Sequence, residues 1–196
     1  MKTQLIISIK IFAVLTVLCG IIYPLLITGF AQSFFPEKAN GSLIRENNKL
    51  IGSELIGQKF DSASYFQSRP SAVDYNPLPS GGSNLGQNSE KLKEQVALRA
   101  EQWTKSNPAV SADKIPSEML FASASGLDPH ISPTAALLQI DRIVEARNLT
   151  DAQKQHIVEL VNKLTEKPQF SLLGESRINV LKLNIALDKQ YKRNNH

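Results

Sequence analysis

Cysteine is nearly absent from the sequence. Cys19 is the single one among 196 residues, and it lies inside an apolar stretch near the N-terminus. No disulfide bond can therefore form within the chain. A domain of ordinary size does not need one, because it can bury a sufficient hydrophobic core. The lack of disulfides is thus compatible with a compartment outside the cytoplasm.

Long runs of one charge are also lacking. The chain carries 22 basic and 18 acidic residues, a net charge of +4. Lys2 and Lys10 precede the apolar stretch, so 20 basic and 18 acidic residues follow it, scattered singly or in pairs. A protein that binds nucleic acid normally concentrates its lysine and arginine residues in a patch or stripe. We therefore exclude nucleic acid as a partner.

Familiar catalytic and metal-binding motifs are lacking as well. No two of the three histidines have the spacing of metal ligands, so we predict no metal site. The glycine-rich stretch at residues 81–86 has neither the GxSxG spacing of a serine hydrolase nor the lysine of a phosphate-binding loop. We predict no catalytic residue.

The same glycine-rich stretch leaves two interpretations open. Gly81, Gly82 and Ser83 expose backbone N–H groups, which can bind an anion or a phosphate. The simpler interpretation is that these residues only form turns.

The most informative feature is a run of 25 positions, from Ile11 to Phe35, without a charged residue. As a helix it spans roughly 37 Å, enough to cross a hydrocarbon core of about 30 Å. Lysines before the run favour a cytoplasmic N-terminus under the positive-inside rule. We predict that residues 1–10 are cytoplasmic, that residues 11–35 form a transmembrane helix, and that residues 36–196 form an extracytoplasmic domain.

A cleaved signal peptide is the competing interpretation of this run. Gly29, Phe30 and Ala31 resemble the small-x-small pattern of a cleavage site. However, the apolar region of a signal peptide spans about 7–15 residues, and this run is far longer. We predict a retained anchor.

Small or helix-disturbing residues recur at every fourth position of the predicted span. They are Thr16, Gly20, Pro24 and Thr28. Such a stripe lets another helix approach closely, which favours docking on a larger membrane protein. The alternative is that small residues are simply common in membrane helices. Pro24 also removes a hydrogen bond to the Gly20 carbonyl, which predicts a kink.

The pattern after residue 36 predicts strands at both ends and helices between them, an α+β (mixed α/β) fold. The strands are expected at 43–44, 50–51, 55–56 and 180–187, with a turn at Asn47 and Asn48. The helices are expected at 61–67, 89–106, 117–124, 132–147 and 150–167. Residues 68–87 are rich in Pro, Gly, Ser and Asn and are expected to form a long loop.

Two polar residues stand out in this region. Arg69 is fixed in a polar loop before a proline, and we regard it as a candidate partner contact. Gln139 borders the apolar face of the helix predicted at 132–147. It is either a residue at the helix boundary or a hydrogen-bonding group for a partner or ligand.

Three segments, at residues 65–72, 75–86 and 122–129, together carry a family resemblance. Shorter matching segments lie at 23–25, 40–44, 131–133, 139–140, 146–149 and 184–188. In this order the segments resemble the KdpC family, the C subunits of bacterial Kdp potassium-transporting ATPases. The resemblance covers nearly the whole chain.

The resemblance implies a single-pass protein of the bacterial inner membrane within a four-part potassium importer. The implied partners are a channel-like potassium-binding subunit, a P-type ATPase subunit and a small single-helix subunit. This chain would be a non-catalytic accessory subunit needed for assembly and for stimulating the ATPase subunit. It would hold no cofactor of its own, and ATP would enter through the ATPase subunit.

The resemblance also implies an alternative role, that of an activator which binds ATP and raises the affinity of the ATPase subunit for nucleotide. Gly81, Gly82, Ser83 and Gln139 are the positions that carry over for that role. The predicted topology opposes it, because these residues would lie across the bilayer from cytoplasmic ATP. A third hypothesis is an anchored hydrolase that uses Ser83 and a histidine.

Overall fold

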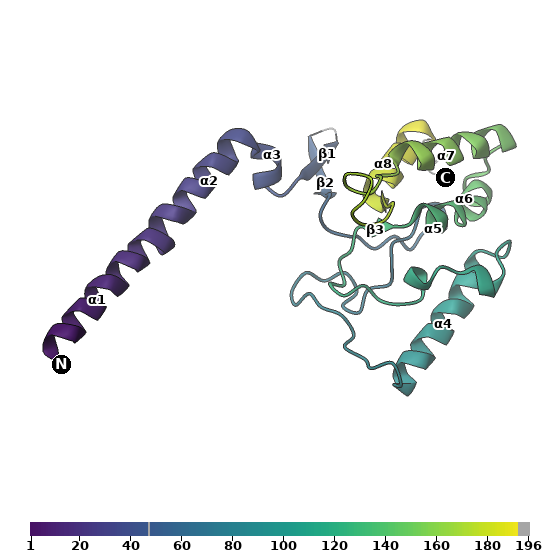
Figure 1. Ribbon diagram of the computed structural model, residues 1–196. Coiled ribbons are helices and arrows are strands. Elements are labelled where there is room, and N and C mark those ends of the chain that lie inside the picture. The colour runs from purple at the N-terminus through teal and green to yellow at the C-terminus, as the bar shows by residue number, and fades with distance from the viewer. Residues whose placement is uncertain (47, 192–196) are drawn as a thin grey trace. The chain divides into compact units, whose positions relative to one another are not determined.

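The chain divides into two compact units, Met1–Ser53 and Glu54–His196. The computed structural model describes residues 1–46 and 48–191 of these units. Figure 1 shows a long helical stretch followed by a hairpin in the first unit, and a group of shorter helices with a small sheet in the second. Helices and strands thus occur together, as the α+β prediction requires.

The first unit begins with one continuous helical stretch, Lys2–Phe34, which is long and apolar enough to cross a membrane. It consists of α1 (Lys2–Val17), a π-helical turn (Leu18–Ile22) and α2 (Tyr23–Phe34). None of its residues packs into a core of the chain. A membrane anchor needs such a helix, and the predicted span of residues 11–35 coincides with most of it.

Pro24 disturbs this helix in a definite way. Proline has no N–H to donate, so the regular ladder of hydrogen bonds must open near residue 24. The structure accommodates this with the π turn, in which the Tyr23 N–H donates to the Leu18 carbonyl.

The first unit ends with the short helix α3 (Pro36–Ala39) and a hairpin of β1 (Leu43–Glu46) and β2 (Lys49–Ser53). The strands are antiparallel, with Leu43 opposite Ser53. The strands predicted at 43–44 and 50–51 are confirmed. Of the predicted turn residues, Asn47 lies outside the described part of the chain. The strand predicted at 55–56 is wrong: the chain turns there, and the Gly57 N–H donates to the Leu127 carbonyl at 2.7 Å.

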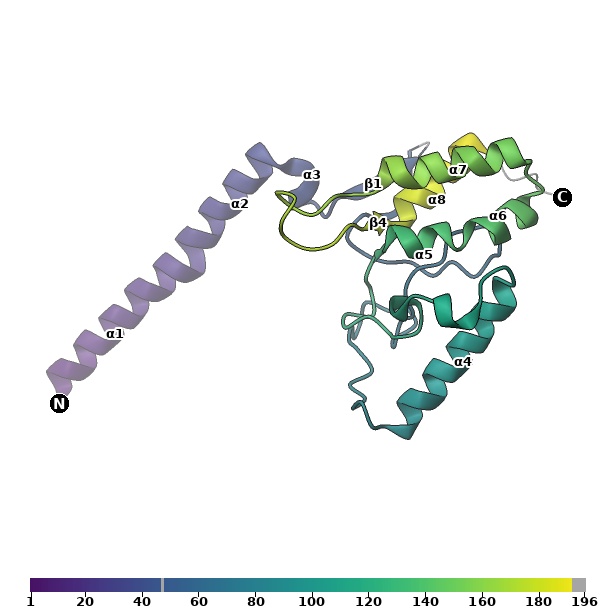
Figure 2. The ribbon, with the colours of Figure 1, turned by 45° about the vertical axis from the view of Figure 1, so that its right-hand side comes forward.

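The second unit is mainly helical. Its helices are α4 (Glu90–Ser106), α5 (Pro133–Leu137), α6 (Ile140–Arg147), α7 (Asp151–Leu164) and α8 (Val180–Gln190). Its strands β3 (His130–Ile131) and β4 (Ile178–Asn179) form an antiparallel pair. Figure 2 shows α5 to α8 packed as one group, with coil segments between this group and α4.

Two of the helices start where they were predicted, at residues 132 and 150, and each start has a side-chain cap. Ser132 caps α5 by accepting from the Ala135 N–H, and Thr150 and Gln153 form a capping box at the start of α7. The core lies among α5 to α8 and extends to Trp103 of α4 and to Val110, Ile115 and Met119 after it, and the extended segment around Phe66 runs through it. Its fully buried large side chains include Phe66, Ile131, Ile143, Ile157, Ile178, Leu183 and Leu187.

The strand predicted at residues 180–187 is wrong, because this segment forms helix α8. Its buried residues include Val180, Leu183, Asn184 and Leu187, whose spacing follows the period of a helix. The apolar residues alone suggested alternation. The helical face becomes visible only when Asn184 is counted as a buried residue.

The helix predicted at 132–147 is interrupted between α5 and α6 at Gln139. In a regular helix the Gln139 N–H would donate to the Ala135 carbonyl. The side-chain Nε2 of Gln139 donates to that carbonyl instead, at 3.1 Å. The backbone N–H turns to the Ala136 carbonyl at 3.0 Å, which makes a tighter turn.

Two shorter predictions also need correction. The helix predicted at 117–124 is only a 3₁₀ turn at Ser117–Met119. The helix predicted at 61–67 does not form, and these residues are extended or in turns. Their backbone groups are bound by side chains from other elements, which leaves no hydrogen bonds for a helix of their own.

Candidate functional site

The most densely bonded polar region of the second unit surrounds the segment 63–67. Seven backbone groups of this segment are hydrogen-bonded by side chains of α6, α8 and the turn before α6. The bound groups are the carbonyls of Ala63, Ser64 and Tyr65 and both the N–H and carbonyl of Phe66 and Gln67. Side chains here do the work that a neighbouring strand does in a sheet. We call Gln139, Arg142, Arg147 and Asn184 the clamp residues.

Gln139 is fully buried, and its amide makes every hydrogen bond that it can. Its Oε1 accepts from the Gln67 N–H at 2.8 Å and from Arg142 Nη2 at 2.7 Å. Its Nε2 donates to the carbonyls of Gln67 at 3.3 Å and Ala135 at 3.1 Å. Gln139 is therefore a boundary residue and a hydrogen-bonding residue at once, and its partners lie within the chain.

Asn184 repeats this arrangement one residue earlier. Its Oδ1 accepts from the Phe66 N–H at 2.8 Å, and its Nδ2 donates to the Phe66 carbonyl at 2.9 Å. Asn184 is 2% exposed and the Phe66 ring is fully buried. Two amide side chains thus hold two successive residues, with the Phe66 ring anchored in the core between them.

Arg142 connects the clamp to the end of α4. Its guanidinium donates to Asn107 Oδ1 at 3.1 Å, to the carbonyls of Ala63 and Tyr65, and to Gln139 Oε1. All these acceptors are neutral oxygens. Burial lowers the pKa of Arg142 to about 10, so it remains a cation at neutral pH.

Arg147, whose side chain is nearly buried, links the clamp to the more exposed Asp188. It donates to the Ser64 carbonyl at 2.8 Å and forms an ion pair with Asp188 at 2.7 Å. Its guanidinium carbon lies 5.0 Å from the centre of the Tyr65 ring, and the Tyr65 hydroxyl donates to the same aspartate. The chain before residue 68 is thus fixed along its length.

The glycine-rich stretch lies in a different part of the second unit. The Gly81 N–H donates to the Ser125 carbonyl at 2.9 Å, and a Cβ added at Gly82 would lie 3.1 Å from the Ala124 carbonyl oxygen. Gly82 thus packs closely against the segment 123–126, where a larger residue would have little room, whereas an added Cβ at Gly81 would meet nothing within 4 Å. Ser83 is exposed. The contacts of this stretch and those of Gln139 involve different residues, so the two proposed nucleotide positions are not joined by a shared contact.

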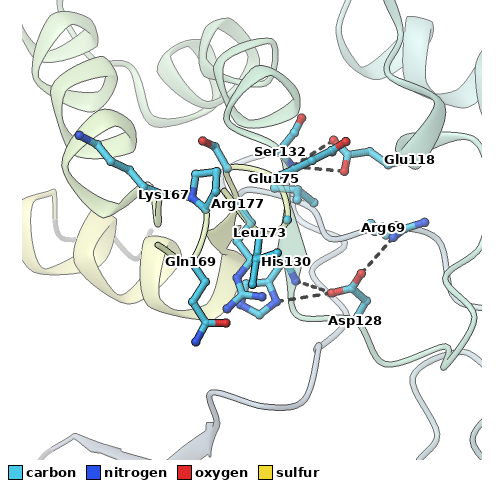
Figure 3. Close-up of a pocket in the computed structure, with 14 residues that line it drawn as sticks. Arg69, Glu118, Asp128, His130, Ser132, Lys167, Gln169, Leu173, Glu175 and Arg177 are labelled. Carbon is cyan, nitrogen blue, oxygen red and sulfur yellow. Dashed lines mark hydrogen bonds and ion pairs between the residues drawn. The ribbon is translucent and has the colours of Figure 1, made fainter. Parts of the chain in front are cut away.

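Arg69 lies beside a polar cavity of about 560 Å³, shown in Figure 3. Its Nη1 donates to Asp128 Oδ2 at 3.0 Å, and Asp128 Oδ1 also accepts the His130 N–H at 3.0 Å. The His130 Nδ1 lies 3.6 Å from the same carboxylate. The Arg69 side chain is 27% exposed, so part of it remains available to a partner.

The charges around this cavity are mixed. Its lining includes Glu118, whose carboxylate accepts the Ser132 N–H, and Lys167 and Arg177 from the segment between α7 and β4. No group of three histidine, cysteine, aspartate or glutamate side chains in residues 1–46 and 48–191 is placed to hold a metal ion. The cavity offers hydrogen bonds and charge, which suit binding and positioning.

The small residues of the membrane stripe all lie in the first unit. Thr16, Gly20, Pro24 and Thr28 are exposed, and no atom of the described residues comes within 4 Å of a Cβ added at Gly20. The stripe therefore has room for another helix.

Sequence reasoning identified Gln139 and Arg69 but missed Arg142, Arg147 and Asn184. Two signals were available. Asn184 interrupts an apolar segment. Arg142 follows Gln139 by three residues, which places Gln139 and Arg142 on one helical face. What they bind could not be foreseen, because segment 63–67 is more than 70 residues away in sequence.

Comparisons with known proteins agree on one family. A family model described as KdpC, the c chain of a K⁺-transporting ATPase, matches residues 5–189. The chain is 43% identical over 186 residues to a protein of Caldanaerobacter subterraneus named potassium-transporting ATPase KdpC subunit, with 95% of each chain covered. A protein of the same name from Burkholderia vietnamiensis is 48% identical over 192 residues, covering 96% of this chain and 97% of its own length.

The clamp predicts a large loss of stability when Gln139 is replaced by leucine. Gln139→Leu leaves the buried Gln67 N–H and Arg142 Nη2 without an acceptor, which we expect to cost about 2–4 kcal/mol of unfolding free energy. Thermal unfolding of the purified chain measures this. The exposed Gln102→Leu is the matched control, expected to stay within about 0.5 kcal/mol. Equal effects of the two substitutions would show that the clamp contributes little.

Asp128 predicts a dependence of stability on acidic pH. Burial raises the pKa of its carboxyl, but hydrogen bonds from His130 and the charge of Arg69 outweigh this, so the pKa lies below its ordinary 3.8. A pKa lowered by folding means that the stabilisation is fully present above the ordinary value and is lost as the pH falls through the lowered one.

We therefore expect the thermal midpoint of the wild type to fall more steeply below pH ~4 than that of Asp128→Asn. Midpoints measured between neutral and strongly acidic pH test this. Parallel curves for the two proteins would refute the role of Asp128.

Proposed function

The chain belongs to the KdpC family, and is thus an accessory subunit of a K⁺-transporting ATPase complex; from this premise we propose that it is a non-catalytic subunit needed for assembly of the complex and for stimulation of its ATPase. The helix Lys2–Phe34 would anchor it in the bacterial inner membrane. Its N-terminus would face the cytoplasm, and the domain after residue 36 would lie outside. The proposed partners are the channel-like, P-type ATPase and small single-helix subunits.

The observation that carries this proposal is the exposed stripe on the membrane helix. A helix that only anchors a domain needs apolar residues all round, whereas close helix packing needs small residues on one side. Thr16, Gly20, Pro24 and Thr28 supply such a side, and no described residue packs over Gly20. A helix of another subunit fits there.

The structure of the second unit supports a scaffolding role over direct binding of ATP. Gln139 is 0% exposed, and all four hydrogen bonds of its amide end within the chain. A nucleotide would have to displace the segment around Gln67 to reach it. Arg69, which is partly exposed beside a polar cavity, is better placed to contact a neighbouring subunit.

A bulky residue on the small-residue stripe of the membrane helix should weaken the binding of the partner subunits. We expect Gly20→Leu to lower the yield of co-purified partner subunits and the potassium-stimulated ATPase activity about 10-fold, since even about 1.4 kcal/mol of lost packing changes affinity tenfold. Co-purification from membranes and ATPase assays measure the effect.

Gly29→Leu is the matched control, because Gly29 lies off the stripe and also has nothing within 4 Å of an added Cβ. A drop of equal size in both variants would point to a general defect of the helix. Full potassium uptake in cells that lack the subunit would defeat the proposed function itself.

The proposed topology predicts labelling from outside the cell. Ser83→Cys in a Cys19→Ser background places one thiol on the exposed loop. A membrane-impermeant thiol reagent should modify it in intact cells whose outer membrane has been made permeable. Labelling only after the inner membrane is broken would place the domain in the cytoplasm and favour the nucleotide-binding alternative.

A further inference from the structure

The segment between α7 and β4 forms a projecting arm, residues 166–177. Glu166 and Arg177 pair at its base through two backbone hydrogen bonds, and Gln169 pairs with Leu173 near its tip. Figure 2 shows this stretch extending away from helices α5 to α8. All residues from Gln169 to Arg177 are exposed.

The tip of the arm presents apolar side chains to solvent. Phe170 is 85% exposed, Leu172 is 84% exposed and Leu173 is 59% exposed. Phe170 and Ser171 both have positive φ angles, 55° and 58°, in the left-handed region that bulky side chains avoid. An exposed phenylalanine in a strained turn is unfavourable for a domain in water, so this tip is suited to an apolar environment.

Most of the backbone N–H groups at the tip, from Gln169 to Leu173, are satisfied within the turn. The N–H groups of Gln169, Ser171, Leu172 and Leu173 all donate to carbonyls of the same turn. A protein interface usually adds hydrogen bonds between the partners, about one per 100–200 Å². A lipid environment demands the opposite, because it offers no partners to free backbone groups. Lys167, exposed beside the apolar tip, is a side chain that suits the headgroup region.

The chain between the membrane helix and the second unit is short, which limits how far the arm can lie from a bilayer that holds the helix. In the first unit, Leu43 lies opposite Ser53, so the path from the end of α2 to Ser53 is essentially residues 34–43, about 30 Å at full extension. In the second unit, Asn179 follows the arm and donates to the carbonyl of Glu54, the residue after Ser53, at 2.8 Å. The arm thus starts close to the point where the chain enters this unit.

We propose that the tip of this arm, with Phe170, Leu172 and Leu173, inserts into the interfacial region of the same bilayer that holds the N-terminal helix. The arm would be a second membrane contact that orients the domain over the lipid surface. This inference rests on the membrane anchoring in the proposed function.

Tryptophan fluorescence in the full-length chain, reconstituted in lipid nanodiscs, tests the contact. The native Trp103 is the only tryptophan and is 6% exposed, so it supplies a constant background. In lipids brominated on their acyl chains, we expect the emission added by Phe170→Trp to fall about twofold, as for a side chain near the headgroup boundary. Leu172→Trp should behave alike and serves as an independent second reporter.

Two control variants make the outcomes distinct. Leu98→Trp, on α4 and 54% exposed, should not be quenched, whereas Phe30→Trp, in α2, should be strongly quenched. Quenching of Phe30→Trp without quenching at either tip position overturns the arm contact alone. An unquenched Phe30→Trp would overturn the anchoring, and the arm contact with it. A tip emission that shifts only in the assembled complex, without lipid quenching, would assign the arm to a partner subunit and also overturn the proposal.

Discussion

The second unit depends on the hydrogen bonds that its clamp residues make to an extended piece of backbone. Burying seven strand-like backbone groups without partners would cost far more than a small domain can tolerate. Gln139 and Asn184 each present a donor and an acceptor to one residue of that segment, as a paired strand would. The buried cation of Arg142 is tolerated for the same reason, because its N–H groups donate to oxygen atoms of the segment and of neighbouring side chains.

This use of polar side chains explains why a conspicuous glutamine need not mark a ligand site. The side-chain amide of Gln139 is buried, and its hydrogen bonds are all made to groups within the chain. The surfaces still open to contacts lie elsewhere: the small-residue side of the membrane helix and the exposed part of Arg69 for other subunits, and the apolar tip at Phe170 for lipid. The proposed assembly role would use such surfaces, because it requires contacts with other subunits.

The two units divide these tasks. The first unit supplies an apolar helix with a π turn that accommodates Pro24, and a hairpin in which β2 returns the chain to the level where β1 begins. The second unit supplies a domain rigid enough to position a cavity and an arm. The arm and the first residue of the second unit are held together by two contacts. Asn179, which follows the arm, donates to the Glu54 carbonyl, and Lys182 forms an ion pair with the Glu54 carboxylate at 2.8 Å.

The sequence by itself determined the apolar span, the hairpin strands, the capped starts of α5 and α7 and the family, because each depends on neighbouring residues or on ordered local motifs. Three predictions from the sequence were wrong: a helix at residues 61–67, a strand at 180–187, and a single helix that continued through Gln139. Only the tertiary structure decided these. Residues 66 and 67 are bound by Asn184 and Gln139, which lie more than 70 residues away in sequence, and the helix breaks at Gln139 because its own side chain takes the Ala135 carbonyl. Local propensity cannot register a distant amide that binds the backbone first.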